Sequence, residues 1–330
     1  MKITPLNELR ERPRRVAIGE FDGVHLGHRA VIAGNDTVLT FEPHPRTVVN
    51  PAQAPKLLTS LALKAELIAG LGVEELVVVP FDQHFANQEP ADFISSVLVD
   101  RLGAREIAVG ENFRFGHCQR GDAALLAADR RFRSRVEPIV AVAGEPISST
   151  RIRRLLATGD VNGAAELLGA RFRLRGTVVA GDQRGRELGF PTANIIPDPG
   201  YVCPADGVYA CWVRIGDDGD IGDGDRVVDG LGAGGEGHGG RGAGQGSGGR
   251  GGIYMAATNV GVRPTFGEDL QLLVEPFLLD FSGDLYGATI TLEFVQRLRG
   301  EQRFHGAAEL IDQMHLDVQS TRQLLASDVA

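Results

Sequence analysis

The sequence predicts an α/β domain with a parallel sheet, followed by a second domain that is an antiparallel sheet or small barrel with a terminal helix. The chain has 330 residues, and domains hold about 100–200 residues each, so two domains are expected. Short β-branched runs alternate with helical stretches in the first half, which is typical of parallel strands joined by crossover helices. Short strands separated by Gly, Pro and Asp fill the second half, which is typical of antiparallel sheets.

Strand and helix patterns follow one another regularly in the first half. The strands read as continuous apolar runs, such as LVVV at 76–79, and a parallel sheet covered on both faces has such strands. The crossover from His28 to the strand at Val38 holds only about ten residues, barely the minimum for a parallel connection, which leaves open whether the sheet starts differently there. The expected strands are 16–18, 38–41, 76–79 and 107–109, and the expected helices are 57–71 and 93–102.

Near residue 172 the alternation of strand and helix patterns gives way to short strand patterns, and the second domain begins there. Helical spacing over 149–169 indicates a connector, and it returns over 301–325 as a terminal helix. We therefore expect one domain over 1–165 and another over 171–330. The expected strands of the second domain are 177–179, 208–213, 254–258, 272–279 and 289–295.

One segment fits neither domain. Fourteen of the 23 residues from Gly230 to Gly252 are glycine, with almost no apolar side chains. Glycine loses more conformational freedom on ordering than any other residue, and this segment has little apolar surface to offset the loss. We predict a disordered surface insertion over about 217–252, between two strands.

Composition excludes several classes of protein. The net charge of -9 argues against a general nucleic-acid binder, which would usually show a basic face. The three cysteines have neither metal-site spacing nor a disulfide pattern, so a reducing cytoplasm is the expected location. No apolar run approaches the roughly 18 residues of a membrane span, and the N-terminus lacks the apolar core of a signal peptide. The sequence leaves a homo-oligomer open.

A glycine-rich motif, GEFDGVHLGH at 19–28, follows the first expected strand and should open a helix near Leu26. Backbone N–H groups of such a turn can approach phosphate oxygens closely. His25 and His28 are three residues apart, so both can face one pocket and donate hydrogen bonds to a triphosphate. A turn with packing histidines and a zinc pair are alternatives, although no third zinc ligand is evident nearby. The turn residues expected to bind ATP phosphates are Gly19, Phe21, Asp22, Gly23 and Gly27.

A second motif of this domain, ISSTRIR at 147–153, combines helix-capping residues with two arginines. A helix cap alone is the simpler interpretation. Together with the glycine-rich motif, it predicts a phosphate cradle contributed from both ends of one domain. The residues expected to bind ATP there are Ser148, Ser149, Thr150 and Arg153.

These two motifs resemble the HxGH and ISSTxxR signatures of the nucleotidyltransferase superfamily, which implies a Rossmann-like fold. FEPHPRTV (41–48), LLTSLALK (57–64) and VGENFRFGHCQRGD (109–122) further resemble the FMN adenylyltransferase module of prokaryotic bifunctional riboflavin kinase/FAD synthetases. The resemblance implies that His25 and His28 act on ATP phosphates in catalysis. It also implies that Asn112, Arg114 and Phe115 border the flavin or adenine site. His44 lies between two prolines and is either a pocket residue or part of a rigid turn.

The second domain opens with GDQRGRELGFPTAN at 181–194. A threonine hydroxyl and an asparagine carbonyl are hard oxygen ligands of the kind that Mg²⁺ prefers, although Gly, Pro and Asn are also common in plain β-turns. The string GRELGFPTAN resembles the riboflavin kinase signature, which implies ATP binding here and a magnesium ion held by Thr192 and Asn194. The residues expected to bind ATP are Gly189, Pro191, Thr192 and Asn194.

Three further strings resemble riboflavin kinase segments in the same order: TNVGVRPTF (258–266), LLVEPFLLDFSGDLYG (272–287) and LRGEQRF (298–304). Glu275 lies between apolar strand residues and matches the family's proposed base, which accepts the proton of the riboflavin 5′-hydroxyl. An exposed strand carboxylate without function is the alternative. The resemblance implies a small antiparallel barrel with a terminal helix.

Taken together, the resemblance implies a bifunctional transferase of flavin cofactor biosynthesis. The C-terminal domain would phosphorylate riboflavin with ATP to give FMN, and the N-terminal domain would adenylylate FMN with a second ATP to give FAD and pyrophosphate. Mg²⁺ with ATP is the expected cofactor, and riboflavin, FMN and ATP are the expected partners, with neither nucleic acid nor membrane. A single-activity enzyme, a flavin sensor without turnover and a cytidylyltransferase are the rival hypotheses, and only the last fails to explain the second domain.

Overall fold

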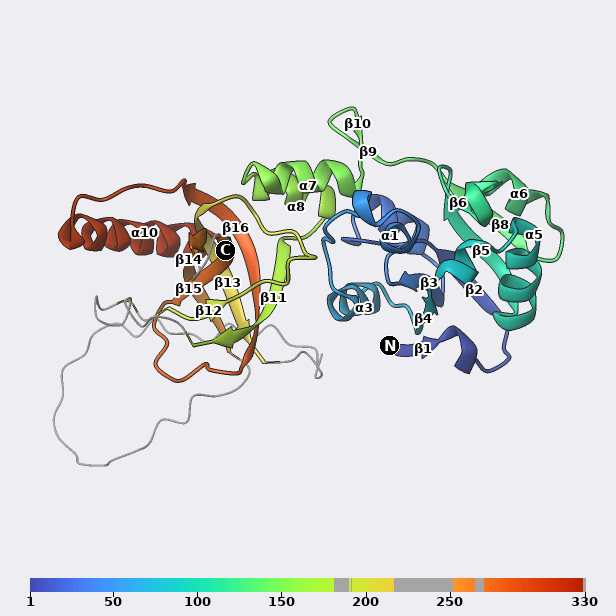
Figure 1. Ribbon diagram of the computed structural model, residues 1–330, viewed down its shortest axis with the longest axis horizontal. Helices are drawn as coiled ribbons and strands as arrows, with labels where there is room; N and C mark the ends of the chain where they lie inside the picture. Colours follow the sequence, from blue (N-terminus) through green and yellow to red (C-terminus); the bar gives the residue numbers. More distant parts are fainter. Residues whose placement is uncertain (181–189, 191, 217–251, 265–269, 329–330) are drawn as a thin grey trace, which may run out of the picture. The chain divides into compact units, whose positions relative to one another are not determined.

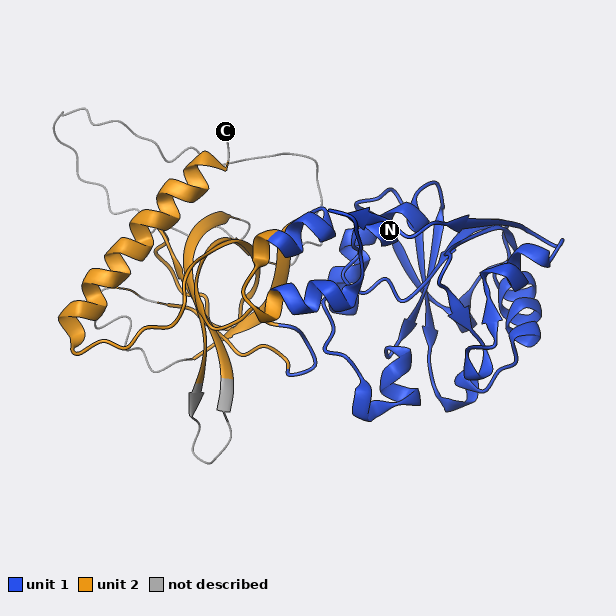
Figure 2. Ribbon diagram, turned by 90° about the horizontal axis from the view of Figure 1, so that it is seen from above, with its two compact units in different colours: residues 1–155, 163–170, 199–202 blue, residues 156–162, 171–198, 203–330 orange. Residues whose placement is uncertain are grey.

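The computed structural model describes residues 1–180, 190, 192–216, 252–264 and 270–328. The chain divides into two compact units, which Figure 2 shows in separate colours. The first unit comprises residues 1–155, 163–170 and 199–202, and the second comprises 156–162, 171–198 and 203–330. The glycine-rich segment predicted as a disordered insertion, about 217–252, lies outside the described residues except for Gly252.

The first unit is built on a six-stranded parallel sheet in the order β1-β4-β3-β2-β5-β8 (Figure 1). Its strands are β1 (Lys2–Pro5), β2 (Arg14–Ile18), β3 (Thr37–Glu42), β4 (Glu75–Pro80), β5 (Ala104–Gly110) and β8 (Arg133–Glu137). The predicted parallel sheet is confirmed. The apolar pattern missed β1 and β8, because both are edge strands with few buried residues and lack the continuous apolar run of a central strand.

The short crossover between the first two predicted strands does not disturb the sheet. β2 and β3 are neighbours, with Val16 opposite Thr37 and Ile18 opposite Leu39. The helix α1 (Leu26–Ile32) makes this connection in seven residues. The carboxyl ends of β2, β3 and β5 therefore meet at one edge of the sheet, where the motif at 19–28 begins.

Alternate strand residues divide the core of the first unit between two apolar clusters. Val16, Ile18 and Leu39 belong to one cluster, and Ala17 and Val38 belong to the other. Because successive side chains of a strand point to opposite faces, both faces of the sheet are covered, as the sequence predicts. No helix among the described residues is long and apolar enough to cross a membrane.

The remaining elements up to residue 168 are short. The helices are α2 (Pro45–Val49), α3 (Leu61–Ala69), α4 (Gln83–Ala86), α5 (Pro90–Asp92), a π-helix (Phe93–Arg101), α6 (Ala123–Ala128), α7 (Ser149–Ala157) and α8 (Val161–Leu168), with 3₁₀ turns at Leu6–Glu8, Pro51–Gln53 and His117–Gln119. Two small hairpins pair β6 (Arg114–Phe115) with β7 (Gly121–Asp122) and β9 (Ala141–Val142) with β10 (Glu145–Pro146). The helix predicted over 57–71 begins only at Leu61, because Ser60 caps it and accepts a hydrogen bond from the Leu63 N–H.

The second unit is a closed barrel in the order β11-β12-β15-β14-β13-β16, with antiparallel neighbours. Its strands are β11 (Phe172–Val179), β12 (Asn194–Ile195), β13 (Gly207–Ile215), β14 (Ile253–Pro264), β15 (Leu270–Leu278) and β16 (Thr289–Arg299). The predicted small barrel with a terminal helix is confirmed. The pattern missed β12, which is only two residues long and belongs to the motif GFPTAN.

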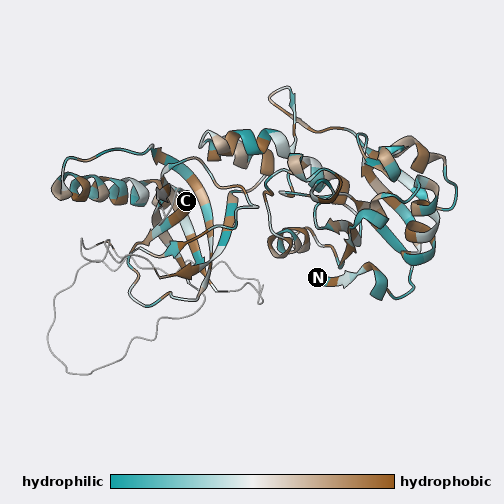
Figure 3. Cartoon of the chain, viewed as in Figure 1, coloured by the Kyte–Doolittle hydropathy of each residue, from teal (hydrophilic) through white to brown (hydrophobic). Residues whose placement is uncertain are grey.

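The terminal helix α10 (Ala307–Ser327) is held to the barrel by a buried ion pair. The Arg299 guanidinium donates from Nε and a terminal nitrogen to both carboxylate oxygens of Asp317, at 2.8–3.1 Å. Asp317 also accepts a hydrogen bond from Gln313, at 3.0 Å. Hydrophilic and hydrophobic residues are interspersed along α10 (Figure 3). Because Arg299 is the last residue of β16, its ion pair with Asp317 holds α10 to the end of that strand.

Candidate functional site

The turn after β2 has the backbone shape that the motif GEFDG requires. Phe21, Gly23 and Val24 have φ angles of 49°, 85° and 43°, in the left-handed region that side chains disfavour. At Gly23 a side chain would be strained by the positive φ, and its Cβ atom would lie 2.7 Å from Leu58 Cδ1, which would have to shift. At Gly19 a Cβ atom would lie 3.0 Å from the Phe21 ring. Close packing thus holds the turn in a fixed shape at the carboxyl edge of the sheet.

The two motif histidines stack on each other at the start of α1. Their ring centroids lie 3.5 Å apart, with 17° between the planes. His25 caps the helix, because its Nδ1 accepts a hydrogen bond from the His28 N–H at 3.2 Å. The proton of a neutral His25 ring therefore lies on Nε2, where it can be donated to a ligand.

Burial keeps both rings neutral. It lowers the pKa of His25 to about 4. Burial, together with the nearby charges of His25 and Lys64, lowers the pKa of His28 well below its usual value. His28 Nδ1 is buried and has no hydrogen-bond partner among the described residues. The histidines are therefore hydrogen-bonding groups at neutral pH and not cations.

The carboxylate of Asp22 joins three separate segments. It accepts hydrogen bonds from the backbone N–H groups of Leu58 and Thr59, at 2.9 and 3.1 Å. Its other neighbour is Arg153, whose guanidinium forms an ion pair with it. The hydroxyl of Ser149 donates to the backbone carbonyl of Asp22, at 3.0 Å. The structure thus brings the motif ISSTRIR, on α7, against the glycine-rich turn.

The remaining motif residues of this unit lie around that junction. Ser148 Oγ accepts a hydrogen bond from the Arg151 N–H at 3.2 Å, which leaves its exposed side chain beside the start of α7. Thr150 is also exposed. A Cβ atom at Gly27 would lie 3.2 Å from His25 Cε1, so this glycine lets the His25 ring lie over the helix.

His44 is part of a polar contact beside the same turn. Its Nδ1 accepts a hydrogen bond from the Arg46 N–H at 3.1 Å, so its Nε2 carries the proton and donates it to Glu20 at 2.6 Å. His44 is buried and caps α2. These contacts support the rigid-turn alternative, and they also connect His44 to Glu20 of the GEFDG motif.

The third predicted group of this unit follows β5. Residues 17 and 108 are opposite each other in β2 and β5, so Asn112 comes off the same sheet edge as the glycine-rich turn. Arg114 and Asn112 are exposed, whereas Phe115 is buried in the core. Phe113, which the sequence interpretation did not single out, stacks on Phe115 with a centroid distance of 5.6 Å. Phe113 is half-buried and also packs against the core cluster that contains Phe115.

In the second unit, the barrel brings GFPTAN against the strand that carries Glu275. The Ala193 N–H donates to the Pro276 carbonyl at 3.0 Å, and Ile195 of β12 is opposite Val274 of β15. Asn194 is buried and Thr192 is half-buried. Gly189 and Pro191 lie outside the described residues. Two segments about 80 residues apart in sequence thus become neighbours.

Glu275 is a half-buried strand carboxylate with a polar neighbour. It is opposite Asn259 in the pairing of β14 with β15, and the Asn259 side-chain amide donates to Glu275 Oε2 at 3.3 Å. Asn259 lies in the string TNVGVRPTF, but the sequence interpretation did not single it out. Two residues further along β14, a Cβ atom at Gly261 would lie 2.8 Å from Glu301 Oε1. The segment before α10 therefore approaches the strands that hold Glu275.

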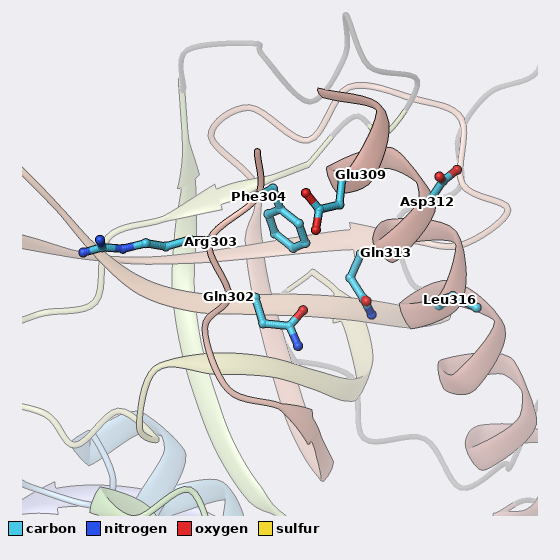
Figure 4. A pocket seen from close by; sticks show the side chains of 7 residues that line it. All are labelled: Gln302, Arg303, Phe304, Glu309, Asp312, Gln313 and Leu316. Atoms are coloured by element: carbon cyan, nitrogen blue, oxygen red, sulfur yellow. The ribbon is translucent and has the colours of Figure 1, made fainter. Parts of the chain in front are cut away.

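A pocket of about 580 Å³ lies beside that segment, between it and α10 (Figure 4). Small-molecule sites have volumes of roughly 300–1,000 Å³. Phe304 and Leu316 provide its apolar surface, and the Arg299 guanidinium lies 5.8 Å from the Phe304 ring centroid. The polar lining residues are Gln302, Arg303, Glu309, Asp312 and Gln313. Three of these residues end the string LRGEQRF, but the sequence did not indicate that they form a pocket with α10.

The oxygen atoms near GFPTAN suit a magnesium ion that accompanies ATP. The Thr192 hydroxyl and the Asn194 carbonyl are neutral hard ligands, and Mg²⁺ usually keeps several waters and phosphate oxygens besides one or two protein ligands. No group of three or more His, Cys, Asp or Glu residues that could hold a metal occurs in the part of the chain described. The zinc alternative for His25 and His28 is therefore not supported by a third such ligand among those residues.

Both halves of the chain match known protein families. Residues 8–151 match the family model described as FAD synthetase, and residues 168–325 match the model described as riboflavin kinase. The chain is 36% identical to a bifunctional riboflavin kinase/FMN adenylyltransferase of Listeria monocytogenes, with 94% of this chain and 92% of that protein covered. It is 34% identical to the Pseudomonas fluorescens protein of the same name, with 98% and 97% covered.

A solved structure agrees along the whole length. A crystal structure described as a macrolide-efflux protein of Streptococcus pneumoniae has a TM-score of 0.78, 27% sequence identity, and coverage of 98% of this chain and 99% of that one. Both units of this chain are thus covered by one experimentally determined fold.

We expect acid to destabilise the protein through His25. The folded chain keeps this ring neutral down to about pH 4, whereas the unfolded chain binds the proton near pH 6.5. The contribution of His25 to the free energy of unfolding is therefore fully present above about pH 6.5. It is lost as the pH falls towards 4, and the free energy of unfolding is lower by about 2 kcal/mol at pH 5. His25→Asn keeps a capping oxygen and removes the titration, so its free energy of unfolding should fall less between about pH 7 and pH 5. Urea unfolding followed by circular dichroism tests this, and equal losses in both proteins would contradict it.

Proposed function

The chain belongs to the bifunctional riboflavin kinase/FMN adenylyltransferase family, and on that basis we propose which residues of its two units perform the two reactions. The enzyme phosphorylates riboflavin with ATP to give FMN, and it adenylylates FMN with ATP to give FAD and pyrophosphate. The observation that carries the proposal is that each unit assembles one cluster of motif residues from segments distant in sequence. We also propose a cytoplasmic location from the three free cysteines.

In adenylyl transfer, the phosphate of FMN attacks the α-phosphorus of ATP and pyrophosphate leaves. The FMN phosphate is already ionised, so this step needs no general base. We assign the phosphates of ATP to the Nε2–H of His25 and the ring of His28, because the backbone N–H groups of Gly19 and Gly23 already donate to the Leu39 carbonyl and to Thr59 Oγ1. The exposed hydroxyls of Ser148 and Thr150 are at the edge of this cluster.

Asp22 and Arg153 serve this site indirectly in our proposal. A carboxylate repels phosphate, and both oxygens of Asp22 already have protein partners. Arg153 divides its donors between Asp22 and the backbone carbonyl of Lys56. We therefore propose that this ion pair positions the turn and α7 instead of contacting ATP with either side chain.

The segment after β5 supplies the surface for a ring. Phe113 offers a half-buried aromatic face, and Asn112 and Arg114 offer polar groups beside it. Phe115 lies beneath Phe113 in the core and supports it. We propose that the flavin or adenine ring packs against Phe113, with Phe115 acting through that contact.

In riboflavin phosphorylation, Glu275 accepts the proton of the 5′-hydroxyl while its oxygen attacks the γ-phosphorus of ATP, and ADP leaves. The hydrogen bond from Asn259 orients the carboxylate towards the substrate. We propose that Thr192 and Asn194 hold Mg²⁺, which neutralises phosphate charge when it is bound. The chain's own residues thus supply the base and its orientation on one strand pair, and the oxygen ligands on the neighbouring strand.

The pocket before α10 is our candidate for the flavin ring. Its volume suits a tricyclic ring, Phe304 provides a flat apolar face, and its segment approaches Glu275 through the contact of Glu301 with Gly261. The ion pair of Arg299 with Asp317 would fix this wall of the pocket.

We predict that Glu275→Gln reduces FMN formation by about 10²- to 10⁴-fold, because the hydroxyl loses its base. FAD formation from added FMN should stay within about twofold of the wild type, because that reaction takes place in the other unit. Chromatography of flavins over time measures both rates. Glu293→Gln, a barrel carboxylate paired with Arg173, is the matched control and should leave both rates unchanged. Tight flavin binding without turnover of riboflavin or FMN would favour the sensor hypothesis instead.

A second prediction concerns the metal. Thr192→Val keeps the shape of the side chain and removes the oxygen, so the Mg²⁺ concentration that half-saturates the kinase should rise about tenfold. The Mg²⁺ dependence of FAD formation from FMN should not change. The measurement is a titration of both rates with Mg²⁺ after treatment with a chelator. If the rate of FMN formation depends on the Mg²⁺ concentration as in the wild type, Thr192 is not a metal ligand.

A third prediction tests the pocket. Phe304→Ala should raise the KM for riboflavin about tenfold, because the ring would lose its apolar face, and it should leave the KM for ATP unchanged. Phe281→Ala, which removes a barrel phenylalanine packed on Tyr254 instead, is the control. Initial rates at varied riboflavin and ATP separate the two constants. If the KM for riboflavin is the same in Phe304→Ala and Phe281→Ala, the flavin ring binds elsewhere.

A further inference from the structure

The first unit contains a buried lysine, the last residue of the string LLTSLALK, to which no role has been assigned so far. Lys64 lies in the first half of α3 and is only 6% exposed. It is one of three lysines in a chain with 34 basic Lys and Arg residues, and the other two, Lys2 and Lys56, are exposed. Lysine is almost never fully buried unless it is paired, so its position requires an explanation.

No protein group pairs directly with this lysine. Among the described residues, its ammonium group has neither a hydrogen-bond partner nor an ion pair within 4.0 Å. The charges that act on it at longer range are those of Asp22, Glu42 and Glu20. Asp22 is already paired with Arg153, and Glu20 with His44. Burial lowers the pKa of Lys64, as expected for a desolvated cation whose nearby acids only partly compensate it.

The backbone holds Lys64 in a fixed relation to the glycine-rich turn. The segment before α3 is tied to Asp22 by the N–H groups of Leu58 and Thr59. The Gly23 N–H donates in turn to Thr59 Oγ1, at 3.1 Å. Lys64 follows one helical turn later, and its N–H donates to the Ser60 carbonyl at 2.8 Å.

A second unpartnered group is near the same place. His28 Nδ1 is buried without a hydrogen-bond partner among the described residues, and the charge of Lys64 acts on this ring. An ammonium group from α3 without a paired acid and a ring nitrogen from α1 without a partner therefore lie near each other and near the turn at 19–23. A cation on a largely buried side chain loses hydration, and an anionic ligand that contacts the ammonium would compensate that loss.

We propose that Lys64 is a phosphate-binding residue of adenylyl transfer, whose ammonium group contacts the triphosphate of ATP and neutralises charge on the departing pyrophosphate. In this step, a bond forms between the FMN phosphate oxygen and the α-phosphorus, and the bond from the α-phosphorus to the bridging oxygen breaks. The electron pair leaves with pyrophosphate, and Lys64 stays protonated. The inference rests on the proposed function of the first unit. It adds a full positive charge to a cluster whose two histidines are neutral.

Lys64→Met tests the proposal in the full chain. The kcat/KM for ATP in FAD formation from FMN should fall about 10- to 100-fold, because a charge-assisted hydrogen bond is lost. Riboflavin phosphorylation should stay within about twofold, since that reaction belongs to the other unit. Lys64→Arg should recover part of the loss, and the exposed Lys56→Met is the matched control with unchanged rates. FAD formation within about threefold of the wild type in Lys64→Met would overturn the proposal.

A second measurement separates phosphate contact from mere neutralisation of the three acids. Inorganic pyrophosphate and AMP are used as inhibitors of FAD formation. If Lys64 contacts the polyphosphate, the inhibition constant of pyrophosphate should rise about tenfold in Lys64→Met, while that of AMP should not change. Equal increases for both would indicate a structural role and overturn the proposal.

Failure of the proposed function gives a different pattern. In that case His25→Asn and His28→Asn would leave FAD formation intact together with Lys64→Met. If the histidine variants lose activity and Lys64→Met does not, the proposal for Lys64 fails alone.

Discussion

The contacts of the Asp22 carboxylate are the constraint on which the adenylyl-transfer site depends. This buried group accepts backbone hydrogen bonds from the segment before α3, pairs with Arg153 of α7 and belongs to the turn that precedes His25. Three segments that are far apart in sequence meet at one side chain. An unpaired carboxylate in this place would be costly, so the ion pair and the two N–H donors are needed together. The position of the histidines relative to α3 and α7 follows from that junction.

Burial at this junction explains why the histidines are neutral. Burial disfavours the imidazolium form, and the acids nearby have other partners: Asp22 has Arg153, and Glu20 has His44. A neutral ring can donate one hydrogen bond from a fixed nitrogen, but it adds no charge. A triphosphate brings several negative charges, so a cation has to come from another element, and the buried ammonium of Lys64 is placed for that.

Much of this could be predicted from local sequence, and the limits have a physical reason. The spacing of His25 and His28 places both at the start of α1, His25 as its cap and His28 in its first turn, and the apolar runs of β2 to β5 identify the parallel sheet. These features depend on neighbours within a few residues. Asn259, Lys64 and the pocket before α10 were missed, because a residue's partner across a barrel or behind a turn is set by tertiary packing. Lys64 did leave a local signal, since a charged residue sits among Leu63, Ala65 and Ile68 on the buried side of α3.

The two sites differ in the way that their chemistry requires. Riboflavin presents a neutral hydroxyl, which must lose a proton to attack a phosphate, and the barrel holds Glu275 with an amide neighbour on the opposite strand. FMN presents an ionised phosphate, for which a free carboxylate would only add repulsion. Two of the acids nearest the first site are accordingly engaged: Asp22 with Arg153, and Glu20 with His44. One chain can thus carry two ATP-dependent reactions, because it offers a base where the nucleophile needs one and pairs Asp22 and Glu20 with other side chains where the nucleophile is already charged.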